Sequence, residues 1–159
     1  MRRQRSARTA LSIHVVRKRS LPMRVFKVFA PLLVALIAWT PAQAKESTPA
    51  TVAGATTIDA AEAKKLFDAG AVFVDVRGDA DFEAGRIPGA KHIPLKGKLT
   101  EAELLKVVQK DQAVVIYCNG EKCALSPEAC AKAVSWGFKK VKFFRTGFPG
   151  WQSAGHPVE

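Results

Sequence analysis

Apolar and polar residues alternate along the second part of this 159-residue chain in a way that predicts a succession of strands and helices. Between the apolar runs, hydrophobic residues recur at helical spacing. The run Ala113-Val-Val-Ile-Tyr117 is uninterrupted, as expected for a strand whose two sheet faces are both covered by helices. The pattern therefore predicts an α/β domain with a mostly parallel sheet, with strands at 71–76, 90–93, 113–117 and 141–144.

The helix boundaries carry recognisable local signals. Asp59 and Thr100 are each followed three residues later by a glutamate, the spacing of a capping box, and both predict a helix start. A third helix is expected to begin near Ala124, because a proline is tolerated anywhere in a first turn, and to end at Gly137. We expect residues 145–150 to form a glycine-rich loop followed by a terminal turn.

The charge of the chain is unevenly distributed. The formal net charge is +11, which by itself is typical of nucleic-acid binders. However, residues 1–44 hold nine of the 25 Lys and Arg residues and no acid, which leaves 25 − 9 = 16 basic against 14 acidic residues in 45–159. A net charge of +2 over that larger part argues against a nucleic-acid partner.

The basic front of the chain has the pattern of a signal peptide. A short positive segment at 23–27 precedes 12 apolar residues at 28–39, and Ala42-Gln43-Ala44 fits the small-x-small cleavage pattern. The apolar run is shorter than the roughly 20 residues that span a bilayer, although an uncleaved anchor is the alternative. Residues 1–22 are either a long positive region or precede the true start at Met23.

Cleavage after Ala44 would leave a mature chain in the periplasm or secreted, with no stable membrane insertion. Residues 45–55, rich in Ala, Thr and Pro without periodicity, are expected to be a flexible leader. Residues 56–159 then suffice for one domain with one modest core.

The cysteines point to chemistry. Three cysteines are an odd number, so in an oxidising compartment at least one thiol is free or kept reduced. Cys118 directly follows the 113–117 strand, at the carboxyl end where parallel sheets bind ligands. A loop over 118–123 that curls into a helix start would direct several N–H groups at the Cys118 sulfur, and Lys122 would add a full positive charge. Both effects lower a thiol pKa and favour a nucleophilic thiolate.

These residues, in this order, resemble the rhodanese domain, a sulfurtransferase fold, over roughly Thr57 to Glu159. The resemblance rests on the strand-end Cys118 that begins a six-residue loop, and on four further segments: Asp75-Val-Arg77, Asp81-Phe82 with Gly85-Arg-Ile-Pro-Gly-Ala90, Gly147-Phe-Pro-Gly-Trp151, and Gly155-His-Pro-Val158. Two positions depart from the family pattern. Arg86 stands where a histidine is commoner, and Cys123 stands where many relatives carry Thr, Ser or Arg.

The resemblance implies a three-layer fold with a central five-stranded sheet flanked by helices, and a persulfide mechanism. The Cys118 thiolate would take sulfane sulfur from a small anionic donor such as thiosulfate, and a thiol or cyanide acceptor would then remove it. The loop amides would hold the persulfide. The residues expected to bind the substrate are Asn119, Gly120, Glu121, Lys122, Cys123 and Arg77.

Several of these residues have a second interpretation. Cys123 is either a passive loop residue or a resolving thiol that forms a disulfide with Cys118. Arg77 is more readily explained by an ion pair with Asp75 than by donor binding. Lys122 either contacts substrate or faces solvent, and Glu121 beside it would weaken the positive field. Cys130, outside this set, is expected to be a small core residue.

Other functions compete with sulfur transfer. A thiol–disulfide redox module would use Cys118 and Cys123, and a non-catalytic carrier would bind the persulfide without turnover. A phosphatase is disfavoured because the 118–123 loop holds no arginine to clamp a phosphoryl group. The two loop cysteines lack partner pairs at zinc spacing, and there is no glycine motif for a nucleotide phosphate, so neither a metal nor a cofactor is expected.

Overall fold

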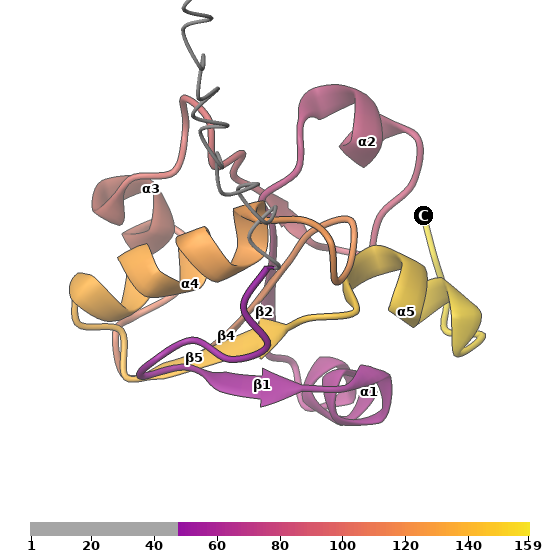
Figure 1. Ribbon diagram of the computed structural model, residues 1–159, viewed down its shortest axis with the longest axis horizontal. Coiled ribbons are helices and arrows are strands. Elements are labelled where there is room, and N and C mark those ends of the chain that lie inside the picture. Colours follow the sequence, from indigo (N-terminus) through magenta and orange to yellow (C-terminus); the bar gives the residue numbers. More distant parts are fainter. Residues whose placement is uncertain (1–47) are drawn as a thin grey trace, which may run out of the picture. The chain divides into compact units, whose positions relative to one another are not determined.

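The computed structural model describes residues 48–159, so the predicted signal peptide and the possible start at Met23 lie outside the described residues. Ten short elements follow one another in the described part (Figure 1). They are β1 (Thr56–Ile58), α1 (Ala60–Asp68), β2 (Val72–Asp75), α2 (Asp79–Glu83), β3 (Lys91–His92), α3 (Glu101–Leu105), β4 (Ala113–Tyr117), α4 (Leu125–Ser135), β5 (Lys140–Phe144) and α5 (Gly147–Ser153).

The five strands form one parallel sheet in the order β1-β5-β4-β2-β3. β4 lies at the centre, where Val115 is in register with Phe73 of β2 and with Lys142 of β5. Figure 1 shows α4 on one side of the sheet and α1 on the other. The predicted three-layer α/β fold is therefore confirmed. In the described residues, no helix has both the length and the apolar character needed to cross a membrane.

The alternation of side chains along β4 divides the core between the two faces. Val114, Ile116 and the following Cys118 belong to a hydrophobic cluster with α4, whereas Val115 and Tyr117 belong to the cluster that contains α1 and α5 side chains. Successive residues of a strand point to opposite faces, so this division is a direct consequence of the period of two. Cys118, the residue that follows the strand, therefore points into the layer beneath α4.

The local helix signals are confirmed. The Asp59 carboxylate accepts the N–H of Glu62 at 2.8 Å, and the Thr100 hydroxyl accepts the N–H of Glu103 at 3.2 Å. α4 begins at Leu125 with Ala124 as its capping residue, so the early start is also confirmed.

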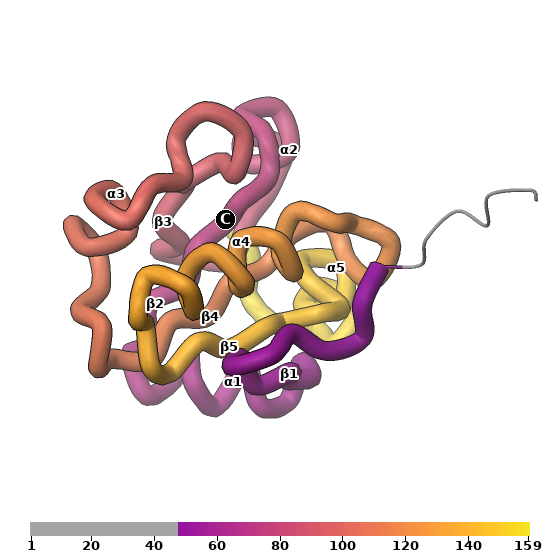
Figure 2. Tube along the Cα trace, turned by 60° about the vertical axis from the view of Figure 1, so that its left-hand side comes forward, coloured from indigo at the N-terminus to yellow at the C-terminus, as the bar shows by residue number. Residues whose placement is uncertain are grey.

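Two elements differ from the expectations. β1 was not predicted, because its three residues are mostly polar and owe their strand geometry to pairing with β5. Residues 145–150 are not simply a loop, since α5 begins at Gly147 and buries Phe148 and Trp151. Of the predicted leader at 45–55, the structure describes residues 48–55 (Figure 2), where Val52 and Ala55 pack against the α4 cluster.

Candidate active site

Cys118 lies at the carboxyl end of the central strand, as predicted, but its side chain is fully buried. The Sγ atom is 3.0 Å from the Ser126 hydroxyl, and it lies within donating distance of two carbonyl oxygens, those of Cys123 (3.7 Å) and Gly120 (4.0 Å). A hydrogen bond to Cys123 and burial both raise the pKa of the Cys118 thiol well above its usual range. This direction is opposite to the lowered pKa that the sequence predicted, because the Cys123 contact and burial outweigh the hydrogen bonds from Ser126.

Cys123 has the environment that was predicted for Cys118. It is only partly buried. Its proximity to Cys118 and to the backbone N–H groups of Leu125, Asn119 and Ser126 outweighs partial burial and lowers the pKa of Cys123 to about 6.

Cys130 is a core residue, as expected. It lies on α4 with no exposed surface, and burial raises the pKa of its thiol to about 12. Within residues 48–159 all three cysteines are free thiols, and no cluster of three metal-ligating side chains occurs there.

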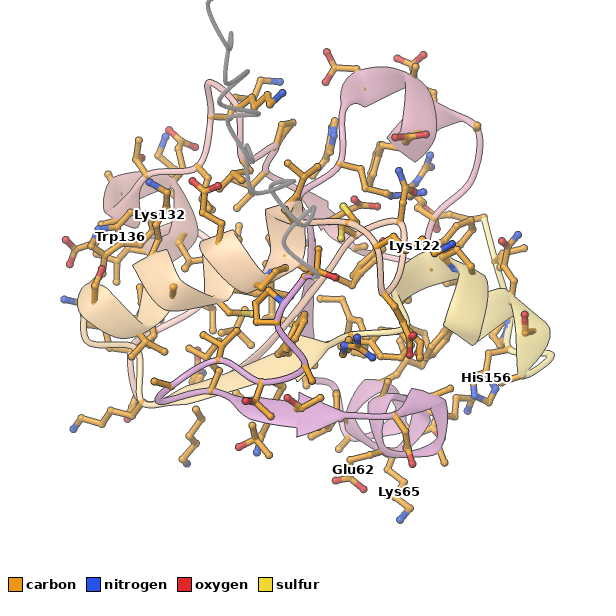
Figure 3. The ribbon with its side chains drawn as sticks, in the orientation of Figure 1. Glu62, Lys65, Lys122, Lys132, Trp136 and His156 are labelled. Carbon is orange, nitrogen blue, oxygen red and sulfur yellow. The ribbon has the colours of Figure 1, made fainter. Side chains whose placement is uncertain are left out.

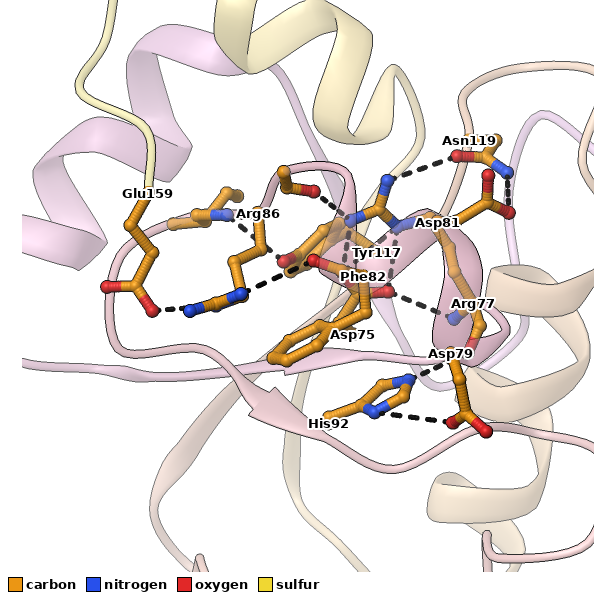
Figure 4. Close-up of polar contacts among 12 residues, drawn as sticks. Asp75, Arg77, Asp79, Asp81, Phe82, Arg86, His92, Tyr117, Asn119 and Glu159 are labelled. Carbon is orange, nitrogen blue, oxygen red and sulfur yellow. Dashed lines mark hydrogen bonds and ion pairs between the residues drawn. The ribbon is translucent and has the colours of Figure 1, made fainter.

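Arg77 forms the buried ion pair with Asp75 that the sequence favoured (Figure 4). Its Nε and Nη2 atoms donate to the carboxylate at 2.6 to 3.0 Å, and Nη2 also donates to the carbonyl of Gly85 at 2.7 Å. The guanidinium lies 4.7 Å from the ring centre of Phe148. With 2% of its surface exposed, Arg77 has almost no area to offer a dissolved anion. The expected ion pair is therefore confirmed, and donor binding by Arg77 stays a prediction.

Asn119 connects this ion pair to the loop (Figure 4). Its side-chain oxygen accepts from Arg77 Nη1 at 3.3 Å, and its amide nitrogen donates to Asp81 of α2 at 2.8 Å. Both ends of the Asn119 side-chain amide therefore hold the loop against Arg77 and α2.

The two charged residues of the loop face outward. Glu121 pairs with Arg145, with Oε1 and Nη1 2.9 Å apart, so its negative charge is largely compensated. The carbonyl of Glu121 also accepts from the Thr48 hydroxyl. Lys122 is exposed, at the loop end of the molecule, whereas Lys132 and Trp136 lie toward the other end of α4 (Figure 3). Glu121 was expected to weaken the positive field of the loop. Arg145, which directly follows β5, offsets this effect.

Two glycines allow the loop to lie against the start of α5. Gly120 has a φ of +99° and Gly147 a φ of +56°, values that favour glycine. A Cβ atom on Gly147 would collide with the carbonyl oxygen of Cys118. The same carbonyl accepts the N–H of Phe148 at 3.0 Å, so close backbone contact fixes where the loop begins.

Several residues at the site were missed by the sequence reasoning. Ser126 was not among the predicted site residues, yet its buried hydroxyl contacts the Cys118 sulfur. Lys96 and Lys98 line a cavity of about 340 Å³ together with Leu125, whose N–H faces Cys123. These contacts join segments distant in the chain, and only the serine had a sequence signal, its place in the first turn of a helix.

Comparison with known proteins identifies relatives of this domain. A model of the family described as Rhodanese-like domain matches residues 59–154. The thiosulfate sulfurtransferase GlpE of Pseudomonas fluorescens is 33% identical over 98 residues, covering 61% of this chain and 84% of the relative. The HTH-type transcriptional regulator Rv0324 of Mycobacterium tuberculosis is 37% identical over 103 residues, covering 64% of this chain but only 44% of the regulator.

A solved structure with the same fold is the BH2092 protein of Bacillus halodurans. It superposes with a TM-score of 0.58 and 29% sequence identity, covering 65% of this chain and 76% of that protein. The five-stranded parallel sheet and its flanking helices are thus shared with a known protein.

Proposed function

Because the chain belongs to the rhodanese-like domain family, we propose that it is a sulfurtransferase. It moves sulfane sulfur from thiosulfate or a related small anionic donor to a thiol or cyanide, through a persulfide on a cysteine of the 118–123 loop. The observation that carries this proposal is the Cys118 thiol at the carboxyl end of β4, where it meets the loop carbonyl of Cys123 and the Ser126 hydroxyl at the start of α4. The sulfurtransferase name of the Pseudomonas relative supports it.

The chemistry needs a thiolate and a way to stabilise the negative charge that stays on sulfur. The thiolate attacks the sulfane sulfur of thiosulfate, the S–S bond of the donor breaks, and sulfite leaves with the electron pair. The persulfide keeps one negative charge, which the N–H groups of the loop stabilise in a preorganised way. Cyanide then takes the outer sulfur as thiocyanate and restores the thiolate, so the reaction proceeds in two easier steps.

Binding of an anionic donor is supported by the cations near the loop. Lys96 and Lys98 line the cavity that Leu125 joins to the loop, and Lys122 lies on the loop itself. The ion pair with Arg145 compensates the one loop carboxylate, Glu121. Asp79 lines the same cavity, so the two lysines leave a smaller net positive charge there, which would attract a dianion such as thiosulfate.

A thiol–disulfide redox module is the second candidate, because Cys118 and Cys123 are free thiols of one six-residue loop and the Cys118 sulfur reaches the Cys123 carbonyl at 3.7 Å. Such a module would cycle between the two thiols and a disulfide, with a protein dithiol or disulfide as its partner. It would accept no sulfane sulfur, which separates it from the sulfurtransferase.

The test uses the domain from residue 45 onward, incubated with thiosulfate and cyanide while thiocyanate is followed. We expect turnover by the wild type and by Cys130→Ala, which removes a buried thiol of α4 that lies outside the 118–123 loop. The double variant Cys118→Ser/Cys123→Ser should produce none. If the wild type forms no thiocyanate and gains no mass of a sulfur atom from thiosulfate, the sulfurtransferase proposal is refuted.

A further inference from the structure

We propose that Arg145, the residue directly after β5, binds the anionic group of the sulfur donor, and that Glu121 of the loop competes with the donor for it. This assignment rests on the proposed sulfurtransferase function and names two residues that set the donor specificity of the same site. Three observations support it: the position of Arg145 beside the loop, the unused part of its guanidinium, and the exposure of its partner.

The topology of the sheet places Arg145 beside the loop that Cys118 begins. β4 and β5 are parallel neighbours whose last residues are in register. Cys118 and Arg145 directly follow these residues, so both leave the sheet at the edge where parallel sheets bind ligands. The next residue also lies against the loop, because a Cβ atom on Gly120 would be 3.2 Å from the carbonyl oxygen of Thr146. The Arg145 side chain therefore reaches the loop from the β5 side.

The resting ion pair leaves part of the Arg145 guanidinium unused. Its Nη1 atom lies 2.9 Å from Oε1 of Glu121. Its Nε atom is buried and has no hydrogen-bond partner within residues 48–159. A guanidinium carries five N–H donors in a planar fork that suits two parallel hydrogen bonds to an oxyanion. The sulfonate end of thiosulfate, with three oxygens, can therefore satisfy this group better than Glu121 does.

The exposure of the two side chains makes their contact easy to exchange. Glu121 has 56% of its side chain exposed and Arg145 has 27%. Ion pairs that water reaches to this degree contribute little to stability, because water solvates both partners when they separate. The backbone of Glu121 is held separately, since its carbonyl accepts from the Thr48 hydroxyl. The carboxylate can thus turn toward solvent while the loop itself stays in place.

The other cations near the loop differ from Arg145. The Arg77 guanidinium is tied to a buried carboxylate, and 3% of its side chain is exposed. Lys96 and Lys98 share their cavity with Asp79. Their ammonium groups act as point charges and lack the planar fork of an arginine. The lysines therefore suit attraction of a dianion, whereas Arg145 suits holding it in one orientation.

The exchange also accounts for release of the product. The thiolate takes the sulfane sulfur, the S–S bond of the donor breaks, and sulfite keeps the electron pair together with the contact to Arg145. Return of the Glu121 carboxylate then displaces sulfite from the guanidinium. Glu121 therefore weakens the binding of donor and product alike.

A double-mutant cycle tests the assignment. It uses the chain from residue 45 onward, which holds all the elements and both hydrophobic clusters of the fold. The second-order rate of loading from thiosulfate is measured as the gain of one sulfur mass. Glu121→Gln frees the guanidinium and should raise this rate about two- to fivefold, whereas Arg145→Gln should lower it about tenfold. The double variant should load as slowly as Arg145→Gln alone, because the gain requires the arginine.

The double variant also separates binding from a general effect of charge. If only net charge mattered, the gain and the loss would cancel, and loading at the wild-type rate in the double variant would refute the exchange. Glu128→Gln is the matched control, since it removes a carboxylate from another exposed ion pair, that with Lys132, and should change the rate less than about twofold.

Two further outcomes overturn the proposal. If Glu121→Gln slows loading or leaves it unchanged, the ion pair only supports the loop. If circular dichroism shows that Arg145→Gln is unfolded, Arg145→Lys takes its place. That variant keeps the charge without the fork and should still load several times more slowly than the wild type. An unchanged rate in Arg145→Lys would then exclude recognition by the guanidinium.

A second readout does not depend on sulfur transfer. Iodoacetate is an anion and iodoacetamide is neutral, yet both alkylate a thiolate with loss of iodide. The ratio of their rates at the two loop thiols should rise in Glu121→Gln and fall in Arg145→Gln. It is measured in the tryptic peptides 111–122 and 123–132, in a Cys130→Ala background. If the wild type takes up no sulfur, the sulfurtransferase function fails, but this ratio still decides whether Arg145 binds anions. A ratio that neither variant changes overturns the proposal even in a protein that transfers sulfur.

Discussion

Substitution of Gly147 by alanine tests whether backbone contact with α5 holds the loop in place. The positive φ alone costs an L-residue about 1–2 kcal/mol, and reduced freedom of the unfolded chain returns about 0.4–1 kcal/mol. The new Cβ would also collide with the Cys118 carbonyl and separate it from the Phe148 N–H. Loss of that hydrogen bond leaves buried groups unsatisfied, at a cost of about 1–3 kcal/mol.

Gly155 provides the matched control. Its φ is +73°, so an alanine there meets the same conformational cost, but a Cβ atom would have no atom within 4 Å. Gly147→Ala should therefore lose about 1–3 kcal/mol more free energy of unfolding than Gly155→Ala. With a urea dependence of about 1 kcal/mol per molar, the unfolding midpoint should fall by about 1–3 M more. Iodoacetamide should also label Cys123 more slowly in the Gly147 variant alone.

Equal urea midpoints for the two variants would refute the reasoning. That outcome would mean that the loop and the start of α5 separate at no cost, and that the Cys118 carbonyl does not define the loop's position. A lower urea midpoint for Gly147→Ala with an unchanged rate of Cys123 labelling would mean that the contact stabilises the fold but does not affect the reactivity of the loop.

Three further predictions follow. Lys96→Gln together with Lys98→Gln should raise KM for thiosulfate severalfold and leave alkylation by the neutral iodoacetamide unchanged; an unchanged KM would exclude the cavity from donor binding. Arg77→Met leaves the Asp75 carboxylate buried without its partner and should lower the free energy of unfolding by about 3–5 kcal/mol in urea titrations, part of which Asp75→Asn should restore in the double variant. Expression of the full chain in a bacterial host should yield an exported protein whose intact mass corresponds to cleavage after Ala44, whereas an uncleaved mass would favour the anchor.

Much of the fold was predictable because its signals are local. The Asp59 and Thr100 caps each bond an N–H three residues away, and the apolar run 113–117 coincides with β4. β1 and α5 were not predictable in the same way. β1 depends on pairing with β5, and α5 depends on burying Phe148 and Trp151 beneath the sheet, so tertiary packing overrides their weak local preference.

The contacts of the candidate site also differ in whether they join residues that are near or far apart in the chain. The ion pair of Asp75 and Arg77 joins residues two apart and could be read from the sequence. The pairing of Glu121 with Arg145 could not, because 24 positions of chain separate them and only the closing of β5 beside β4 brings them together.

The order of residues by itself determined that this chain makes a parallel sheet, ends its central strand on a thiol and follows that thiol with a short loop and a helix. It also determined that Cys118 points to the same face as Val114 and Ile116, since alternation along a strand is a property of the backbone. Only the tertiary structure decided which groups surround the Cys118 sulfur. The pKa of a thiol depends on the groups that folding brings within hydrogen-bond distance, and here the fold buries this sulfur beside the Ser126 hydroxyl and the carbonyls of Gly120 and Cys123.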